Sequence, residues 1–378
     1  MSADAVPIAE CDLLIVGAGI VGLAHAAEAV SRGVTVTIID RDSRAVGASV
    51  RNFGHCCITA QTGELLDLAL VARERWLHYS ALAGFFSVES GALAVARSPE
   101  ELAVLDELSA SREHGQVRIV DAATARTTLS TGDPAVVGAA LLRDDLRVDP
   151  REAVESLAAW LAAQPGVTCL WRTSYLGSDG SAGAITSRGS IRAGHTIVCV
   201  GHDIDYLYPK LAEQHGIDRC GLQMARIEAP GDRLIAPAIL TGTSMLRYPA
   251  FTETTAAVAL RARVRADDPG LVAIDANVMF TQRPDGTIIV GDSHRTEPTM
   301  DPFQAEATTE LLLGRVRDVL GVPSVRVVER WLGVYASSPQ HPYLIEEISP
   351  TVTAVSVTSG VGMTISFGLA RKVMSQLS

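Results

Sequence analysis

Apolar and polar positions follow two alternating patterns along the chain, which predicts an α/β protein. Short apolar runs predict strands, and they fall at residues 12–16, 34–39, 167–171, 195–200 and 352–357. The run at 195–200 has no polar alternation, as in parallel strands that are covered on both faces. Helical spacing and capping residues predict helices at residues 63–83, 98–115, 149–163, 302–320 and from about 363 onward. From 219 to about 290, alternating runs separated by turn signals predict antiparallel strands.

Segments with alternating strands and helices interleave with mostly antiparallel segments, and this order predicts discontinuous domains. Residues 1–83, 143–215 and 326–378 are expected to form one nucleotide-binding domain. The inserts at 84–142 and 216–325 are expected to form a mostly antiparallel substrate domain. A ligand is then expected between the two domains.

The first predicted strand leads into a glycine-rich turn, and the second strand ends on Asp40. In this dinucleotide fingerprint, Gly17 permits a tight turn, Gly19 lets the backbone approach a pyrophosphate, and Gly22 allows close packing of helix and strand. The phosphates are expected at the start of the following helix, where free N–H groups favour anions. Asp40 is able to accept the hydroxyls of an adenosine ribose. Taken alone, the fingerprint suggests NAD as readily as FAD.

The composition is that of a soluble globular chain of 378 residues, with 47% hydrophobic and 20% charged residues. Its net charge of −11 argues against nucleic acid and anionic membranes as partners, although a local arginine cluster is still able to bind an anionic substrate. The six cysteines show no metal-ligand spacing, and no apolar run approaches the length of a membrane span. The N-terminal apolar stretch lacks the basic region of a signal peptide. We therefore expect a cytoplasmic protein with reduced cysteines and no bound metal.

A second glycine-rich turn follows the last predicted strand and again leads into a helix, at Ser359-Gly360-Val361-Gly362-Met363-Thr364. A helix start favours negative charge, and reduced flavin is anionic around N1 and C2=O. Nicotinamide needs no such feature. This turn therefore favours FAD over NAD.

Together these motifs resemble the superfamily of FAD-dependent amine and amino-acid oxidoreductases that includes D-amino-acid oxidase, glycine oxidase and sarcosine oxidase. The resemblance covers essentially the whole chain, and it also rests on the segments 47–54, 198–202, 285–291 and 330–333. It implies a GR2-type Rossmann-like FAD-binding domain with an antiparallel-sheet substrate domain. It also implies that FAD is bound by Gly17, Gly19, Ile20, Val21, Gly22, Asp40, Arg41, Ser49, Arg51, Asn52, Phe53, Gly54, Gly201, His202, Trp331, Gly333, Gly360, Val361, Gly362, Met363 and Thr364.

The resemblance further implies that this FAD is noncovalent. Family members with covalent flavin carry a histidine within the 47–54 segment or a cysteine near the C-terminus. This chain has Arg51 at the first of these positions and no cysteine after Cys220.

The predicted substrate-facing strand departs from many amino-acid oxidases, because Tyr335 stands where those enzymes have an arginine. A single hydroxyl cannot replace the bidentate guanidinium that binds a substrate carboxylate. The run Arg51-Asn52-Phe53-Gly54-His55 resembles a subgroup associated with phosphonate breakdown, which implies an aminophosphonate such as 2-aminoethylphosphonate. A phosphonate dianion requires several donors, and the candidate catalytic and substrate-binding residues are Arg51, His55, Arg247, Tyr248, His294 and Tyr335.

The implied reaction is the oxidative deamination of a small anionic amine. A neutral amine loses a hydride from its α-carbon to flavin N5, the imine hydrolyses, and O2 or another acceptor reoxidises the cofactor. One alternative is an oxidase of glycine, sarcosine or D-amino acids, with Arg247 or Arg51 binding the carboxylate. Others are a 2-hydroxy-acid dehydrogenase with His55 as its base, and a non-catalytic nucleotide-binding sensor. The oligomeric state is left open.

Overall fold

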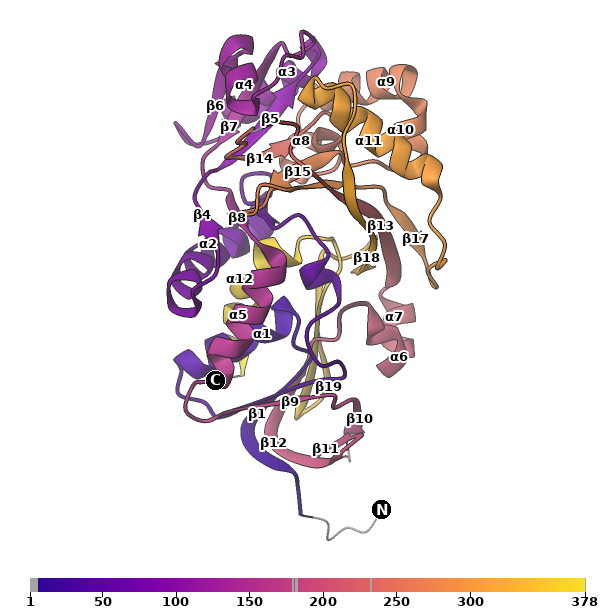
Figure 1. Cartoon of the computed structure of the whole chain (residues 1–378). Coiled ribbons are helices and arrows are strands. Elements are labelled where there is room, and N and C mark those ends of the chain that lie inside the picture. Colours follow the sequence, from indigo (N-terminus) through magenta and orange to yellow (C-terminus); the bar gives the residue numbers. More distant parts are fainter. Residues whose placement is uncertain (1–5, 179, 181–182, 232, 378) are drawn as a thin grey trace.

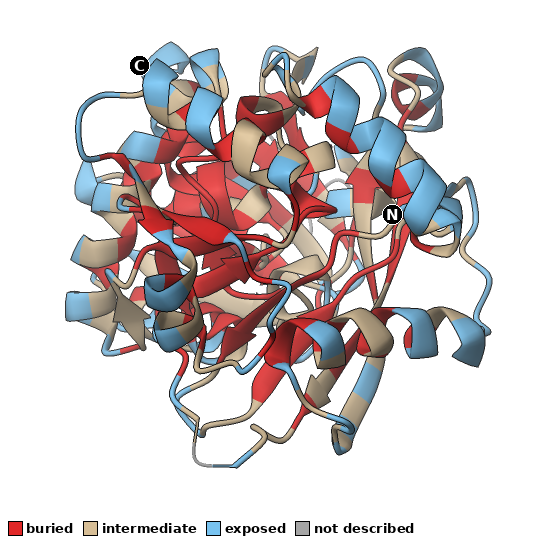
Figure 2. Cartoon of the chain, turned by 90° about the horizontal axis from the view of Figure 1, so that it is seen from above, coloured by how far each residue is buried: buried red, intermediate tan, exposed pale blue. Residues whose placement is uncertain are grey.

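The computed structural model describes residues 6–178, 180, 183–231 and 233–377. Over these residues the chain builds two large sheets at opposite ends of the molecule, and helices cover both (Figure 1). Seen from above, the buried ribbon is enclosed by helices whose outer faces are exposed (Figure 2). The α/β fold expected from the sequence is therefore confirmed.

The first sheet has eight strands in the described part of the chain, and its central strands are parallel. Strand β1 lies between β2 and β12, so the ends of these strands meet at one edge of the sheet, where ligands bind in such folds. The strands are β1 (Ala9–Val16), β2 (Val36–Asp40), β9 (Val167–Trp171), β10 (Tyr175–Ser178), β11 (Gly183–Thr186), β12 (Gly189–Val198), β19 (Tyr343–Ser349) and β20 (Val352–Val357). Their helices and short 3-10 turns are α1 (Ile20–Ser31), η1 (Ala48–Val50), α2 (Gly63–Ala83), α5 (Pro150–Ala162), η2 (Gly201–Asp203), α6 (Ile204–Leu207), α7 (Pro209–Gln214) and α12 (Gly362–Gln376).

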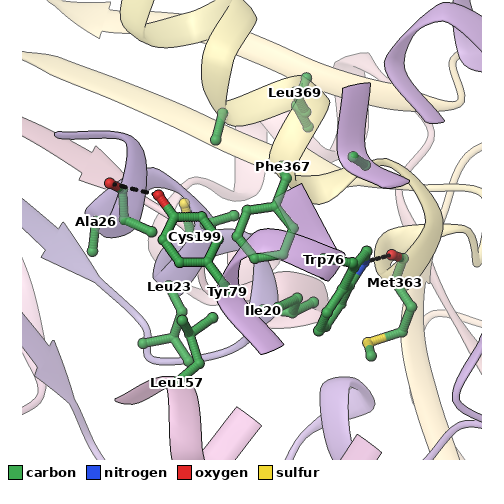
Figure 3. Packing of buried hydrophobic residues seen from close by; sticks show 14 of the residues in the cluster. Ile20, Leu23, Ala26, Trp76, Tyr79, Leu157, Cys199, Met363, Phe367 and Leu369 are labelled. Carbon is green, nitrogen blue, oxygen red and sulfur yellow. Dashed lines mark hydrogen bonds between the residues drawn. The ribbon is translucent and has the colours of Figure 1, made fainter. Parts of the chain in front are cut away.

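An aromatic cluster joins α2 to α12 beside this sheet (Figure 3). The Trp76 ring meets Phe367 edge-on with centroids 5.1 Å apart, and Tyr79 stacks on Phe367 at 5.2 Å. Trp76 Nε1 donates a hydrogen bond to the carbonyl of Met363, over 2.7 Å, as Figure 3 shows. The cluster thus fixes the start of α12 relative to α2.

Gly368→Ala is expected to destabilise the protein, because α2 and α12 approach closely at this glycine. A Cβ at Gly368 would overlap the backbone of Leu68, and overpacking of this kind costs about 1–3 kcal/mol or more. Gly314→Ala is the matched control on another helix, where the new methyl would only contact the end of Arg317. The control is expected to be neutral or stabilising by up to about 1 kcal/mol. Urea unfolding of both variants measures the difference, and equal stabilities would contradict the close packing.

The second sheet has nine strands among the described residues and is antiparallel apart from the pairing of β14 with β5. Its strands are β5 (Ala92–Ala96), β6 (Val117–Asp121), β7 (Gly138–Leu142), β13 (Asp218–Ile227), β14 (Ala238–Leu240), β15 (Met279–Gln282), β16 (Ile288–Gly291), β17 (Arg295–Glu297) and β18 (Val327–Ser337). Its helices are α3 (Pro99–Ser111), α4 (Ala122–Leu129), η3 (Ser244–Leu246), α8 (Pro249–Thr252), α9 (Ala257–Asp267), α10 (Pro269–Ala273) and α11 (Glu306–Leu320). Between the two large sheets lies a small one of β3 (His55–Cys56), β4 (Ser87–Val88) and β8 (Leu146–Val148).

The expectation of antiparallel strands throughout 219–290 is wrong for residues 244–273, which form short helices. Both α8 and α10 begin with proline at the first helical position, where its missing N–H has no cost. Strand β18 also pairs with β13 in the second sheet, although residues 326–378 were assigned to the nucleotide-binding domain. The exact domain borders stay a prediction. Within the described residues, no helix combines the length and apolar character needed to cross a membrane.

Candidate active site

A cavity of about 510 Å³ is lined by residues of both large sheets. The first sheet contributes the loops that follow β1, β2, β9, β12 and β20. The second contributes side chains of β13 and β18 and the turns around Arg247 and Asp292. The cavity therefore lies where the sequence predicts a ligand, between the two kinds of sheet.

The turn between β1 and α1 forms one wall of this cavity. Gly17 has φ +103°, and a Cβ at this position would overlap the carbonyl of Cys199, so only glycine fits. Gly19 precedes Ile20, the first residue of α1, and the Ile20 N–H donates to Ser49 Oγ over 2.9 Å. Val21 also lines the cavity, whereas Gly22 lies behind the wall and packs against the backbone of Gly17. The start of α1 is thus open to an anion from the cavity side.

Asp40 marks one end of the cavity. Its Oδ2 accepts a hydrogen bond from the N–H of Ala18 over 2.8 Å, and its Oδ1 accepts one from the N–H of Asp42 over 2.9 Å. Burial raises the pKa of Asp40 from its ordinary value. Each oxygen keeps a further lone pair for a hydroxyl donor. Nearby Arg41 pairs with Asp203 over 2.6 Å, and both residues line the cavity with Gly201 and His202.

The segment that includes η1 crosses the middle of the cavity. Arg51 Nη1 donates to the carbonyl of Leu332 over 3.1 Å, and Asn52 Oδ1 accepts from the N–H of Gly54 over 2.7 Å. Ser49, Arg51, Asn52 and Phe53 line the cavity, as does Gly333 of β18. Two predicted residues support this segment from outside the lining: Gly54, which packs against Val148, and Trp331, which donates to the carbonyl of Arg51.

The start of α12 lines the other end of the cavity through Gly360, Gly362 and Met363. Gly360 has φ +77°, and a Cβ there would lie 3.1 Å from the Tyr335 ring. Val361 and Thr364 do not belong to this lining. Thr364 Oγ1 instead accepts from the N–H of Cys57, and Val361 lines a second cavity of about 430 Å³. Two helix starts therefore face one long cavity, with an acid at one end, which fits the diphosphate, ribose and flavin of FAD.

An arginine and a tyrosine meet beyond Gly360. Arg247 Nη2 donates to the Tyr335 hydroxyl over 2.9 Å, and Arg247 Nη1 lies 3.3 Å from an oxygen of Asp275. Burial acts to lower the pKa of Arg247, but Tyr335 and Asp292 outweigh it and raise that pKa. Burial also raises the pKa of Tyr335 well above its usual range, so its hydroxyl stays protonated. A cation and a neutral donor are thus held together at this end.

Tyr248 and His294 also line this end of the cavity. The Tyr248 hydroxyl lies 3.5 Å from the sulfur of Met279, and burial raises the pKa of this tyrosine. Burial lowers the pKa of His294 to about 3, and its ring lies edge-on to Tyr335. Four of the predicted substrate-binding side chains are therefore brought together.

His55 does not line either cavity described above. Its Nε2 lies 2.8 Å from Asp145 Oδ2, and both side chains are buried. Cys57 joins them, with the three ligand atoms within 4.8 Å of one another, and burial raises the pKa of the Cys57 thiol well above its usual value. Asp145 Oδ1 also accepts from the N–H of Thr59. His55 belongs to β3 itself, so this buried cluster stabilises the small sheet and does not contribute to the cavity lining.

Two polar residues that the sequence analysis did not single out also face the substrate end, Asn277 and Asp292. Burial raises the pKa of Asp292 to about 7, against the opposing charge of Arg247. The available signal was an acid directly after the apolar run at 288–291 and two residues before His294.

The family model described as FAD dependent oxidoreductase (DAO) matches residues 12–376 of this chain. A search of curated proteins gives no match. Among solved structures, L-proline dehydrogenase from P. horikoshii is similar, with 18% identity and a TM-score of 0.80 over 99% of this chain and 94% of that one. Glycine oxidase from Bacillus cereus has 17% identity and a TM-score of 0.78, covering 97% and 94% of the two chains. Iminodiacetate oxidase from Chelativorans sp. has 20% identity and a TM-score of 0.74, covering 96% and 95%.

These identities are low, so the structural likeness shows the fold. The family model spans nearly the whole chain, and the cavity that it covers has the features that FAD requires. The protein therefore belongs to the DAO family and is an FAD-dependent oxidoreductase.

Proposed function

We propose that this enzyme oxidises a small amine that carries a phosphonate group, such as 2-aminoethylphosphonate or a hydroxylated or N-methylated relative. The observation that carries the proposal is the hydrogen bond from Arg247 to Tyr335 at the end of the cavity, beside Gly360. This pair offers a positive charge and hydroxyl hydrogen where a substrate would meet the reactive end of the cofactor. FAD, when bound, accepts a hydride from the substrate carbon.

The donor set suits a compact dianion. Tyr335 accepts a hydrogen bond from Arg247 and lines the cavity, and its hydroxyl hydrogen is shared between the neighbouring Cys220 thiol and a ligand in the cavity. The Tyr248 hydroxyl donates to the Met279 sulfur, a weak acceptor 3.5 Å away, so it is a second neutral donor for the substrate. A phosphonate has three oxygens and uses more donors than a carboxylate does. The arginine and two tyrosines thus bind and orient one end of the substrate.

An amine as the oxidised group is supported by three of the similar structures, a proline dehydrogenase, a glycine oxidase and an iminodiacetate oxidase, although an L-alpha-glycerophosphate oxidase is also similar. The names of the first three proteins refer to amines or amino acids. The cavity of this chain also contains the hydrogen-bond acceptors Asn277 and Asp292, in addition to the donors Arg247, Tyr248 and Tyr335. An amine with an anionic tail matches both.

Anaerobic mixing of the FAD-loaded protein with 2-aminoethylphosphonate is expected to bleach the visible absorbance of the flavin. A panel with glycine, sarcosine, D-alanine and D-lactate provides the comparison under the same conditions. Because phosphonate uses the extra donors, we expect the largest rate constant for bleaching with the aminophosphonate. Bleaching by a plain amino acid, with none by any aminophosphonate, would reject the phosphonate assignment.

An oxidase of glycine, sarcosine or D-amino acids is the second candidate. It is favoured by the same Arg247, which lines the cavity and is able to bind a carboxylate. Arg51 is less suited, because its guanidinium already donates to the carbonyl of Leu332. A 2-hydroxy-acid dehydrogenase loses its proposed base, since His55 pairs with Asp145 outside the cavity lining.

A further inference from the structure

One wall of the main cavity gathers side chains that accept hydrogen bonds. Asp292 is 4% exposed, and within the described residues its Oδ1 has no hydrogen-bond partner. Asn277 is 2% exposed, and its Oδ1 is unpaired over the same part of the chain. The two residues are fixed side by side, because the N–H of Asn277 donates to the carbonyl of Asp292 over 2.8 Å and the N–H of Asp292 donates back over 2.9 Å.

His294 adds a third acceptor to this wall. Its Nδ1 lies 3.0 Å from the carbonyl oxygen of Asp275, and a carbonyl only accepts, so Nδ1 carries the ring hydrogen. Burial holds the imidazole neutral, with a pKa of about 3, and Nε2 therefore has a lone pair. This Nε2 lies 3.8 Å from Asp292 Oδ2. When Asp292 is ionised, two acceptors thus face each other with no hydrogen between them.

A buried carboxylate is unfavourable unless a donor or an opposite charge compensates it. The nearby cation is Arg247, whose two terminal nitrogens are directed to Tyr335 and Asp275. Arg247 and the Asn277 side chain favour the charged form of Asp292, but burial outweighs them. Within the described residues, Oδ1 of Asp292 still has no partner, so this oxygen is placed to accept a hydrogen bond from a donor in the cavity that it lines. An ammonium group fits, because it is a compact positive charge with three N–H donors.

We propose that Asp292 binds the ammonium group of the substrate and accepts one proton from it. This role rests on the amine oxidation proposed above. An R–NH3+ and the Asp292 carboxylate become R–NH2 and a carboxylic acid: one N–H bond breaks, one O–H bond forms, and no electron changes hands. The neutral amine left on the substrate is the form able to lose a hydride. Arg247 and Asp292 together then select a zwitterion by its two opposite ends.

The protonation of Asp292 gives the proposal a pH signature. Its pKa is raised to about 7 by burial, so its charge and its attraction for an ammonium increase from pH 6 to pH 8. The other titratable or charged groups that face it are Arg247, Tyr248, Asp275, His294, Tyr335 and Cys220. Of these, His294 stays neutral over this range, and burial raises the pKa values of both tyrosines and of Cys220.

The test uses the FAD-loaded protein and two probes that are the separate halves of the substrate, ethylammonium and ethylphosphonate. Dissociation constants are measured by calorimetry at pH 6, 7 and 8 for the wild type and Asp292→Asn. Asp275→Asn is the matched control, because it removes a carboxylate beside Arg247 that lies outside the main cavity lining. Asp292→Ser provides a second variant in case the first is unstable, and thermal melting checks the fold of all four proteins.

Asp292→Asn is expected to weaken ethylammonium binding by about 10- to 100-fold, as for loss of a charged hydrogen bond, and to abolish its pH dependence. Binding of ethylphosphonate by Asp292→Asn should not weaken. Asp275→Asn should bind ethylammonium with the affinity of the wild type. Wild-type affinity for ethylammonium in Asp292→Asn, or no ethylammonium binding by the wild type, would overturn the proposal. Failure of ethylphosphonate alone to bind would instead reject the phosphonate function, and the ethylammonium result would still decide the role of Asp292.

Discussion

Arg247→Met is expected to lower kcat/KM for the best anionic amine by about 100- to 1,000-fold, or about 3–4 kcal/mol. Methionine retains much of the length of the side chain but has no charge and no N–H donors. The Tyr335 hydroxyl would lose the Arg247 donor that lies 2.9 Å away. Among the described residues that line the substrate end of the cavity, Arg247 is the cation, so the anionic end of the substrate would lose its charge partner. Steady-state kinetics measure the loss, which should fall mainly on KM.

Arg261→Met is the control for this experiment. Arg261 is an exposed arginine that lines the second cavity, and its replacement removes the same charge without touching the main lining. Its kcat/KM should stay within about threefold of the wild type, because water and salt screen the interaction of an exposed charge with the substrate. Tyr335→Phe should have a smaller effect than Arg247→Met, because it removes one neutral donor. Equal activities of Arg247→Met and the wild type would show that another group binds the anion.

Gly19→Val is expected to yield a folded protein that does not retain FAD. Gly19 has φ −76° and ψ 173°, a conformation that valine adopts readily, and its Cβ would meet only Ser49 Oγ at 3.0 Å. The added side chain would occupy the position where the backbone approaches the pyrophosphate, and we expect FAD affinity to fall more than about 100-fold. The ratio of flavin absorbance to protein absorbance after gel filtration measures retention.

Gly132→Ala is the matched control, because a Cβ there meets nothing within 4 Å and the residue lies outside the cavity lining. The apo forms of both variants should unfold within about 1 kcal/mol of the wild-type apo protein. A yellow Gly19→Val protein with full FAD content would contradict the assignment of this turn to the pyrophosphate. A variant that loses both fold and cofactor would show that Gly19 is required for packing.

Local patterns in the sequence were sufficient to predict the elements that carry the cofactor. The turn at Gly17 and the acid Asp40 lie on two strands whose apolar character and order predict adjacent parallel pairing. The turn at Gly360 could be predicted for the same reason, as the exit of a buried strand into a helix. Residues 244–273 were expected to be antiparallel strands like their neighbours, and the prolines that begin α8 and α10 were not recognised as helix starts.

The substrate end depends on contacts between distant residues, which a single sequence does not reveal. The family resemblance of its segment placed His55 near the flavin, but its partner Asp145 lies 90 positions away, and the paired ring does not line the cavity. In the sequence Asp292 is only the middle residue of the turn before His294, and no local pattern sets it apart. What distinguishes it is the burial that raises its pKa and the proximity of Arg247 and His294, and both arise only when the second sheet forms.

The hydrogen bond from Trp76 to the carbonyl of Met363 joins α2 to the start of α12, so this part of the fold forms late during synthesis of the chain. Strand β1 pairs with β12 from Ala9↔Ile191 to Val16↔Val198, and α12 packs on α1 and α2 only after residues 362–376 have been synthesised. A nascent chain therefore carries its fingerprint turn long before it has a complete cavity. Such a chain leaves apolar surfaces of α1 and α2 uncovered until α12 has been synthesised, so we expect the incomplete chain to be prone to aggregation up to that point.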